Sequence, residues 1–320
     1  EKHFYLGPMT KNVVDSVISF NNSNNYFGFI PSRRQIECKE LGSGYVNGWS
    51  THEFVNHANN TVILRDHAGP LQGLAEDDGL LSLSKDIDAG IKFLHIDPWK
   101  SVESINEAIE KTASLIMHAS SIKECFFEIG TEEAIFKYTP AELNNFIIGV
   151  RSRIGNLFEK VIYCVVQSGT SVKALSNIGS FNKAVSSEMC DICHGFNLKA
   201  KEHNSDYLSI EDINKRINSG VDSLNIAPEL GVIETNVILK RLENNDNLKS
   251  MFHEICYKSG KWKKWVDKTP DMHTISKISG HYTFNTLDFK NLKTKLGADL
   301  DEEIKFEINK KLEMLWNIKK

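Results

Sequence analysis

The sequence lacks an apolar run that approaches the roughly 18 residues needed to span a bilayer. Residues 1–4 also lack the apolar stretch of a secretory signal peptide. Proline is scarce, with seven in 320 residues, and no low-complexity linker divides the chain. These absences predict a cytoplasmic globular protein with no membrane partner.

Cysteine pairs that would build a disulfide framework are missing as well. The six cysteines are scattered, and three lie within or beside apolar runs such as residues 161–166, so reduced and mostly buried thiols are expected. Cys190, Cys193 and His194 have the spacing of a c-type haem attachment site, but such attachment requires export, and no export signal is seen. A lone CxxC pair is also weak evidence for structural zinc.

A large net charge of either sign is absent too. The 38 basic and 42 acidic residues are interleaved along most of the chain, and the net charge is −4. A general nucleic-acid-binding surface is therefore not expected. One basic run, residues 258–268, contains Trp262 and Trp265 and has two interpretations. It is a local site for an anionic ligand or RNA, or it is solvated surface near an apolar anchor, which is the commoner case.

The sequence does contain a repeated alternation of short β-branched or aromatic runs with longer amphipathic stretches. This alternation is typical of parallel βαβ units. No glycine-rich dinucleotide fingerprint follows the first run, so an α/β fold of the closed (β/α)8 TIM-barrel type is favoured over an open doubly wound sheet. Eight runs have the apolar character of strands buried on both faces: residues 3–6, 26–30, 61–65, 92–96, 125–129, 161–166, 197–201 and 223–226.

Several helix starts lie between these runs. Ser50, Thr139 and Ser209 are predicted N-caps, and Thr139 is followed by a proline in the first turn and a glutamate in the capping-box position. The barrel is predicted to occupy residues 1–246. Residues 247–320 are predicted to form a C-terminal helical extension packed on the barrel.

Polar, titratable residues follow six of the eight predicted strands. In a barrel of this kind the loops after the strands meet on one face, where catalytic residues lie. Their side chains are therefore expected to converge on one polar site. Imidazole and carboxylate ligands from different strands suit a divalent cation, Zn or Mn with Mg as a further option. The loops are residues 31–34, 66–70, 95–100, 128–133, 167–170 and 202–206.

Each histidine at these strand ends also has a purely structural interpretation. His67 beside Asp66 belongs either to a helix-capping pair or to a metal or catalytic site, and the Gly-Pro that follows favours a loop and hence the second. The same two interpretations apply to His203. His95, inside an apolar run, is as often a satisfied core histidine as a ligand.

The charged residues on this rim leave alternatives open as well. Glu128 ends a strand, and if it is buried it needs a cation or a neighbouring base beside it. Arg33 and Arg34 either clamp a phosphate or carboxylate in a bidentate manner or are ordinary surface arginines.

A set of segments has a characteristic order and spacing: residues 44–50 (GYVNGWS), 65–70 (RDHAGP), 95–97 (HID), 128–132 (EIGTE), 165–169 (VVQSG), 202–207 (EHNSDY), 225–230 (NIAPEL) and 279–282 (SGHY). Together they resemble the class II tagatose- and fructose-bisphosphate aldolases. The likeness is greatest to the subunit of bacterial tagatose-1,6-bisphosphate aldolase that is often called non-catalytic, and it covers most of the chain.

The resemblance implies roles for particular residues. In class II aldolases an Asp-His pair supplies a proton-transfer Asp and a metal-ligand His, which correspond here to Asp66 and His67. His203 resembles a second ligand. The loop that contains Asn225 and Glu229 resembles one that helps to hold the substrate.

The chain departs from the catalytic members of the family at Gln167. Those members carry a further ligand His after the sixth strand. The departure implies either that Glu128 or Glu132 replaces the lost ligand, or that the protein binds a phosphorylated sugar without cleaving it. The segment around His281 is expected to reach the barrel mouth.

The candidate residues fall into three groups: catalytic, Asp66 and Glu128; metal ligands, His67, His95, Glu132 and His203; substrate-binding, Arg33, Arg34, Lys100, Gln167, Ser168, Asn225, Glu229 and His281. The favoured hypothesis is a metal-dependent aldolase that cleaves a phosphorylated sugar through an enediolate. A sugar-phosphate isomerase or epimerase would use the same enediolate. The third hypothesis is a non-catalytic partner subunit of an aldolase complex, and a homo-oligomer is an equally open partner state.

Overall fold

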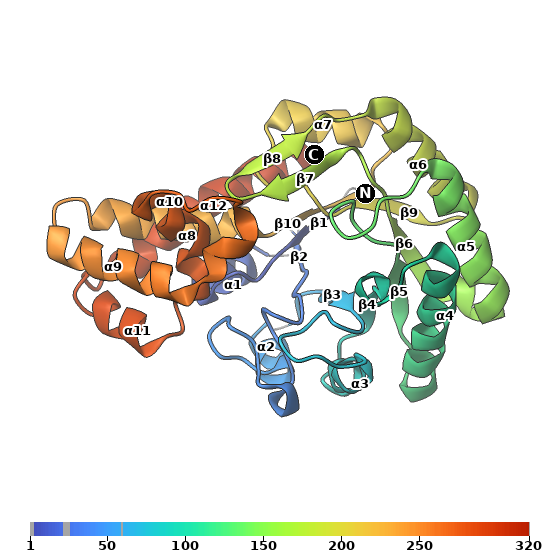
Figure 1. Cartoon of the computed structure of the whole chain (residues 1–320), viewed down its shortest axis with the longest axis horizontal. Coiled ribbons are helices and arrows are strands. Elements are labelled where there is room, and N and C mark those ends of the chain that lie inside the picture. The colour runs from blue at the N-terminus through green and yellow to red at the C-terminus, as the bar shows by residue number, and fades with distance from the viewer. Residues whose placement is uncertain (1–2, 22–25, 59, 320) are drawn as a thin grey trace.

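Eight parallel strands form a barrel in the computed structural model, which describes residues 3–21, 26–58 and 60–319 (Figure 1). Their order is β2-β1-β10-β9-β6-β5-β4-β3. Parallel bridges from Phe29 to Ile63 and from Ser32 to Asp66 join the two end strands, so the predicted (β/α)8 barrel is confirmed. The strands are β1 (His3–Leu6), β2 (Gly28–Phe29), β3 (Leu64–Ala68), β4 (Phe93–Ile96), β5 (Phe126–Ile129), β6 (Val161–Val165), β9 (Lys199–Glu202) and β10 (Ser223–Ile226).

All eight predicted strands are present, but two are displaced along the chain. β3 begins and ends three residues later than the predicted run 61–65, so Asp66 and His67 lie in the strand and not after it. β9 likewise extends to Glu202. An apolar run marks the part of a strand that is buried on both faces. The strand itself continues as long as its backbone groups form hydrogen bonds with the neighbouring strands.

The barrel helices begin at the predicted caps. Ser50 and Thr139 each form a complete capping box, and the Ser209 side chain accepts a hydrogen bond from the Asp212 backbone N–H. The helices are α1 (Lys11–Phe20), α2 (Thr51–His57), α3 (Leu80–Asp88), α4 (Ile105–Ile122), α5 (Pro140–Ile154), α6 (Lys183–Gly195), α7 (Ile210–Asn218) and α8 (Pro228–Arg241), with short 3-10 turns η1 (Lys39–Leu41), η2 (Trp99–Ser101) and η3 (Gly155–Lys160). None of the described helices is long and apolar enough to cross a bilayer.

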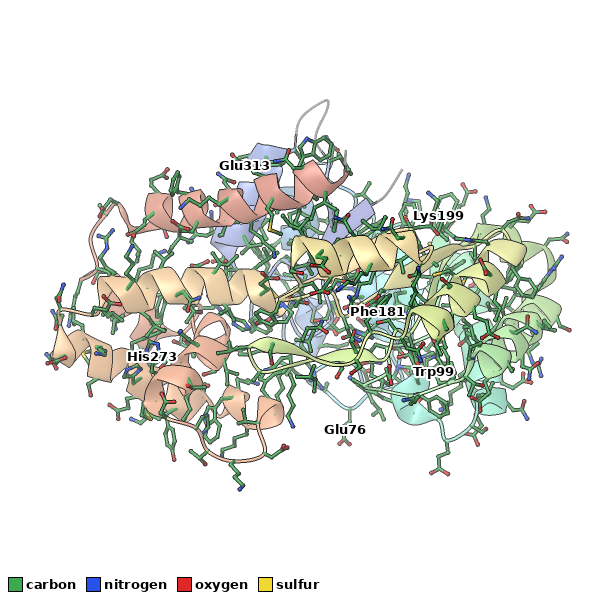
Figure 2. The ribbon with its side chains drawn as sticks, turned by 90° about the horizontal axis from the view of Figure 1, so that it is seen from above. Glu76, Trp99, Phe181, Lys199, His273 and Glu313 are labelled. Carbon is green, nitrogen blue, oxygen red and sulfur yellow. The ribbon has the colours of Figure 1, made fainter. Side chains whose placement is uncertain are left out.

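A group of helices beyond α8 lies to one side of the barrel, on the left of Figure 1. It comprises α9 (Asp246–Ser259), η4 (Lys261–Trp265), α10 (Met272–Ser279), η5 (Gly280–Tyr282), α11 (Leu287–Lys293) and α12 (Leu300–Lys319). In Figure 2 the labelled His273 marks this end of the molecule and Trp99 the other. The last helix, α12, packs against α1 and α8, and Lys311 on it pairs with Glu229 at 2.6 Å. The division of the chain at residue 246 stays a prediction.

An antiparallel hairpin, β7 (Thr170–Lys173) and β8 (Ser176–Gly179), follows β6 and was not predicted. The Asn177 side chain donates hydrogen bonds to the backbone oxygens of Asn204 and Asp206, so the hairpin lies against the loop after β9. Lys173 pairs with Asp267 at 2.6 Å and connects the hairpin to the extension.

The six cysteines are all free and buried, as predicted. Cys190 and Cys193 lie inside α6, where burial raises the pKa of the Cys190 thiol and a hydrogen bond with Cys164 together with burial raises that of Cys193. Both therefore behave as core side chains. Residues 1 and 2, which entered the expectation about a signal peptide, lie outside the described residues.

A buried carboxyl on α8 gives a pH-dependent prediction. Glu234 accepts hydrogen bonds from Thr10 and Asn12, but burial outweighs them and raises its pKa from 4.5 to about 7. The folded chain therefore keeps a proton that the unfolded chain loses, and the free energy of unfolding should fall as pH rises from about 4.5 to about 7. Glu234→Gln should remove up to about 3 kcal/mol of this fall, measured by urea denaturation at pH 5 and pH 8. If the free energy of unfolding of the variant has the same pH dependence as that of the wild type, the raised pKa of Glu234 is contradicted.

Candidate active site

A β-bulge turns two consecutive residues of β3 toward the barrel mouth. Between Arg65 and Ala68, β3 has one residue more than the facing segment of β4. His67 has a φ of 48°, in the left-handed region that is uncommon for residues other than glycine. Consecutive side chains of a regular strand point to opposite faces, whereas this bulge lets Asp66 and His67 line the same cavity.

Three imidazole rings form a triangle at this mouth. His67 comes from β3, His95 from β4, and His203 follows β9 directly. Their ring centroids lie 5.1 Å apart for His67 and His95, 5.6 Å for His67 and His203, and 4.7 Å for His95 and His203. His95 is a fully buried histidine, and it also belongs to this cluster.

Each of the three rings has one nitrogen in hydrogen-bond contact with a carboxylate or a backbone oxygen. The His67 Nδ1 contacts Asp97 Oδ2 at 2.5 Å, and the His95 Nε2 contacts the Gly130 backbone oxygen at 2.9 Å. The His203 Nε2 contacts Glu128 Oε1. Such outer partners fix the orientation of an imidazole. The second nitrogen of His95, Nδ1, also accepts a hydrogen bond from the His67 backbone N–H at 3.2 Å.

The other nitrogen of each ring is directed toward Asp66. The distances are 3.4 Å from His67 Nε2 to Asp66 Oδ2, 3.3 Å from His95 Nδ1 to Oδ1, and 3.6 Å from His203 Nδ1 to Oδ1. Burial alone would raise the pKa of Asp66, but the histidines, His67 first, hold it well below its usual range. A carboxylate and three imidazole nitrogens thus share one small volume.

A buried ion pair lies directly beneath this cluster. Glu128 and Lys201 are fully buried inside the barrel and lie 2.7 Å apart. The Lys201 Nζ lies 4.1 Å above the centre of the Tyr5 ring. Burial opposes the ionised form of Glu128, yet Lys201 and the histidines, His203 first, keep its pKa well below the usual range. The neighbouring base that the sequence required for Glu128 is therefore Lys201, which was not among the candidates.

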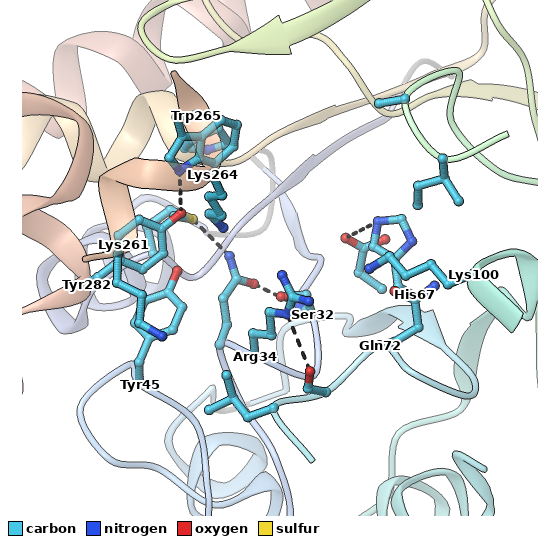
Figure 3. A pocket seen from close by; sticks show the side chains of 18 of the residues that line it. Ser32, Arg34, Tyr45, His67, Gln72, Lys100, Lys261, Lys264, Trp265 and Tyr282 are labelled. Carbon is cyan, nitrogen blue, oxygen red and sulfur yellow. Dashed lines mark hydrogen bonds and ion pairs between the residues drawn. The ribbon is translucent and has the colours of Figure 1, made fainter. Parts of the chain in front are cut away.

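Asp66 and His67 of this cluster line one end of a cavity of about 690 Å³, whereas His95 and His203 do not line it (Figure 3). Five of the predicted site residues line it: Arg34, Asp66, His67, Lys100 and Glu132. The ligand atoms of His67, Glu132 and His203 lie within 4.8 Å of one another, as do those of Asp66, His95 and His203. The sequence therefore predicted most of the polar residues at this end.

Arg33 does not line the cavity, although its neighbour Arg34 does. The Arg33 guanidinium is buried and pairs with Glu37 at 2.7 Å and Asp77 at 2.5 Å. It also donates a hydrogen bond to the Gly69 backbone oxygen at 2.8 Å. All three guanidinium nitrogens thus donate to protein groups, and Arg33 stabilises the loop after β3.

Gln167 and Ser168 are likewise engaged with the protein. The Gln167 amide donates to the backbone oxygens of Thr131 and Phe136, at 3.1 and 2.7 Å. The Ser168 hydroxyl donates to buried Glu202 at 3.0 Å. Neither lines the cavity, and both hold the loop after β6 in place.

The remaining three substrate-binding candidates lie behind the cavity wall. Glu229 accepts a hydrogen bond from the Tyr207 backbone N–H and pairs with Lys311. Asn225 is buried, and its side-chain oxygen has no hydrogen-bond partner in the described part of the chain. His281 is buried in a second cavity of about 270 Å³, where burial and then Lys264 lower its pKa to about 3 and keep it neutral.

The other end of the cavity is built partly by the extension, whose segment around His281 was expected to reach the barrel mouth and contributes Tyr282. The contribution of η4 was not predicted. Tyr45 belongs to the segment after β2, and four further residues come from η4 and η5. Figure 3 shows them facing Arg34 across the cavity: Lys261, Lys264, Trp265 and Tyr282. The signal in the sequence was the basic run with its two tryptophans, whose commoner interpretation was solvated surface.

No protein-family model matches the sequence, and a comparison with curated proteins finds no match either. Solved structures do match. A probable tagatose 6-phosphate kinase from Sinorhizobium meliloti has a TM-score of 0.69 at 14% identity, over 96% of this chain and 86% of that one.

Two enzymes of known type are also similar in structure. The fructuronate-tagaturonate epimerase of Cohnella laeviribosi has a TM-score of 0.62 at 10% identity, over 98% of this chain and 81% of that chain. The fructose-bisphosphate aldolase of Campylobacter jejuni has a TM-score of 0.56 at 13% identity, over 91% and 90%. At these identities the likeness shows a shared fold, one that aldolases and epimerases of sugars use.

Proposed function

We propose that the chain is a metal-dependent enzyme of the aldolase type that cleaves a carbon–carbon bond of a phosphorylated sugar at the barrel mouth. One observation carries the proposal. His67, His95 and His203 are each oriented through one nitrogen by a carboxylate or carbonyl, and each directs the other nitrogen toward Asp66. Imidazoles oriented in this way are typical ligands of a catalytic zinc. The groups with ligand atoms within 4.8 Å of one another include Asp66, His95 and His203, and also His67, Glu132 and His203.

The donor set fits a divalent cation, zinc before manganese or magnesium, because imidazole is a preferred ligand of zinc. His95 supplies the third imidazole in a chain that has Gln167 where the catalytic class II aldolases have a histidine. Glu132 adds a carboxylate oxygen close to His67 and His203. A cation held there supplies Lewis-acid polarisation of a substrate oxygen.

Asp66 is the residue proposed to move the proton. Its carboxylate lies between the imidazoles and lines the cavity, where it accepts the proton of a substrate hydroxyl while the adjacent carbon–carbon bond breaks. The electron pair of that bond passes to the neighbouring carbonyl and forms an enediolate. Asp97 and Glu128 are proposed to act through His67 and His203 as positioning residues.

The fold of the epimerase from Cohnella laeviribosi supports a second candidate function. Its TM-score of 0.62 exceeds the 0.56 of the Campylobacter jejuni aldolase. An epimerase would return a proton to the same enediolate and leave the carbon skeleton intact. Deuterium from solvent in an unbroken product would favour this function, and two shorter products would favour cleavage.

Metal content tests the observation on which both functions rest. Purified protein should contain about one equivalent of divalent metal, and His203→Ala should lose it because a ligand is removed. Added zinc at a hundredfold excess over Kd should stabilise the wild type by about 2.7 kcal/mol and leave the variant unchanged, measured by thermal denaturation.

His52→Ala is the matched control, because His52 is an exposed histidine on α2. It should bind metal as the wild type does. If neither the wild type nor the control binds a metal, both catalytic functions lose their basis, and the partner-subunit hypothesis would be tested by co-purification from the native host.

A further inference from the structure

Four cationic side chains line the cavity. Arg34 and Lys100 come from the barrel, and Lys261 and Lys264 come from η4 of the extension. Figure 3 shows Lys264 and Arg34 directed toward each other, with Lys100 beside His67 at the far side. The basic wall therefore has contributions from segments more than 200 residues apart in the sequence.

Three carboxylates act on one end of this wall without pairing with it: Asp97, Glu132 and Asp66 favour the charged form of Lys100. Among the described residues, none of the four cations forms an ion pair, and Arg34 donates only a long hydrogen bond of 3.4 Å to the Gly73 backbone oxygen. Lys264 lies above the Trp265 and Tyr282 rings, at 4.7 and 4.9 Å. Lysines elsewhere on the surface, such as Lys85, do have acidic partners.

The four charges are close enough to disturb one another. Burial, then Arg34, Lys261 and Lys100, lower the pKa of Lys264 to about 8. Burial and Arg34 likewise lower the pKa of Lys100. Like charges that form no ion pair cost free energy, and an anion bound among them would offset that cost.

We infer that Arg34, Lys100, Lys261 and Lys264 bind the phosphate group of the ligand, so that the extension completes the site. A phosphate carries nearly two charges and offers several acceptor oxygens, which suits four cationic donors. A sugar carboxylate carries one charge and is satisfied by a single arginine. The binding of phosphate by these four residues does not depend on the proposed function. The statement that this phosphate belongs to a substrate cleaved at Asp66 does rest on the proposed function.

The test is a titration of the full chain with inorganic phosphate and with fructose 6-phosphate, followed by calorimetry and by tryptophan fluorescence. Lys264→Met and Lys261→Met should each weaken binding roughly ten- to hundredfold, the effect of losing one charge-assisted hydrogen bond. Lys264→Arg should retain binding. Lys263→Met is the matched control, because Lys263 lies in the same turn but does not line the cavity.

Three outcomes would overturn the inference: unchanged affinity in Lys264→Met and Lys261→Met, galacturonate binding as tightly as fructose 6-phosphate, or no saturable phosphate binding by the wild type. The same titration in His203→Ala separates this inference from the proposed function. Phosphate binding that persists in His203→Ala and in a metal-free wild type supports the basic wall even if no metal-dependent activity is found.

Discussion

Asp66→Asn should lower kcat/KM for retro-aldol cleavage by roughly 10²- to 10⁴-fold, the usual contribution of a general base. An amide of the same shape cannot accept the substrate proton. The three imidazole nitrogens that face Asp66 remain in place, so the variant should keep its metal. The measurement is product formation from a panel of phosphorylated sugars, with metal content determined on the same preparations.

Asp88→Asn, at the exposed end of α3, is the matched control and should retain full activity. Full activity in Asp66→Asn would remove the proposed base. Loss of the metal together with the activity would instead make Asp66 a ligand, because replacing a base that does not coordinate lowers metal affinity far less than removing a ligand.

Lys201→Met should destabilise the fold by about 3 kcal/mol or more, because it leaves the Glu128 carboxylate without its closest cation in the barrel interior. His203 remains as a partner of Glu128 and limits the loss. The free energy of unfolding from urea denaturation is the measurement. The double variant Lys201→Met with Glu128→Gln should recover much of the loss, since the buried charge is then gone.

Lys173→Met is the control for this second experiment. Lys173 also pairs with a carboxylate, but both partners are exposed, so its replacement should change the free energy of unfolding little. Equal effects of Lys173→Met and Lys201→Met would mean that burial of the Glu128 pair contributes nothing to stability.

The sequence predicted the barrel and one end of the site because both depend on local patterns. Short apolar runs identify strands buried on both faces, and the polar residue after each run lies on the catalytic rim whichever way the helices pack. Asp66, His67 and His203 were found in this way. The role of His95 was ambiguous, because a histidine inside an apolar run is expected both for a core residue and for a metal ligand.

The rest of the site depends on side-chain direction and on long-range packing, which such patterns do not contain. Arg33 and Arg34 are adjacent, yet Glu37 and Asp77 draw the first inward while the second lines the cavity. Lys201 lies in β9, and because its side chain is charged nothing in the sequence indicated that it points into the barrel interior. Lys261 and Lys264 reach the mouth only because of how the extension packs against the barrel, and no local pattern predicts that this packing brings η4 to the cavity.

The cavity wall runs from Met9 in the segment after β1 to Tyr282 in η5. During synthesis the N-terminal parts of a chain emerge first. All barrel strands have therefore been synthesised by residue 226, whereas Lys261 and Lys264 of the basic wall follow about 35 to 38 residues later and Tyr282 about 56 residues later. A nascent chain with a finished sheet thus has the histidine cluster without the wall that encloses it, and a ligand can be held at both ends only after η5 has been made.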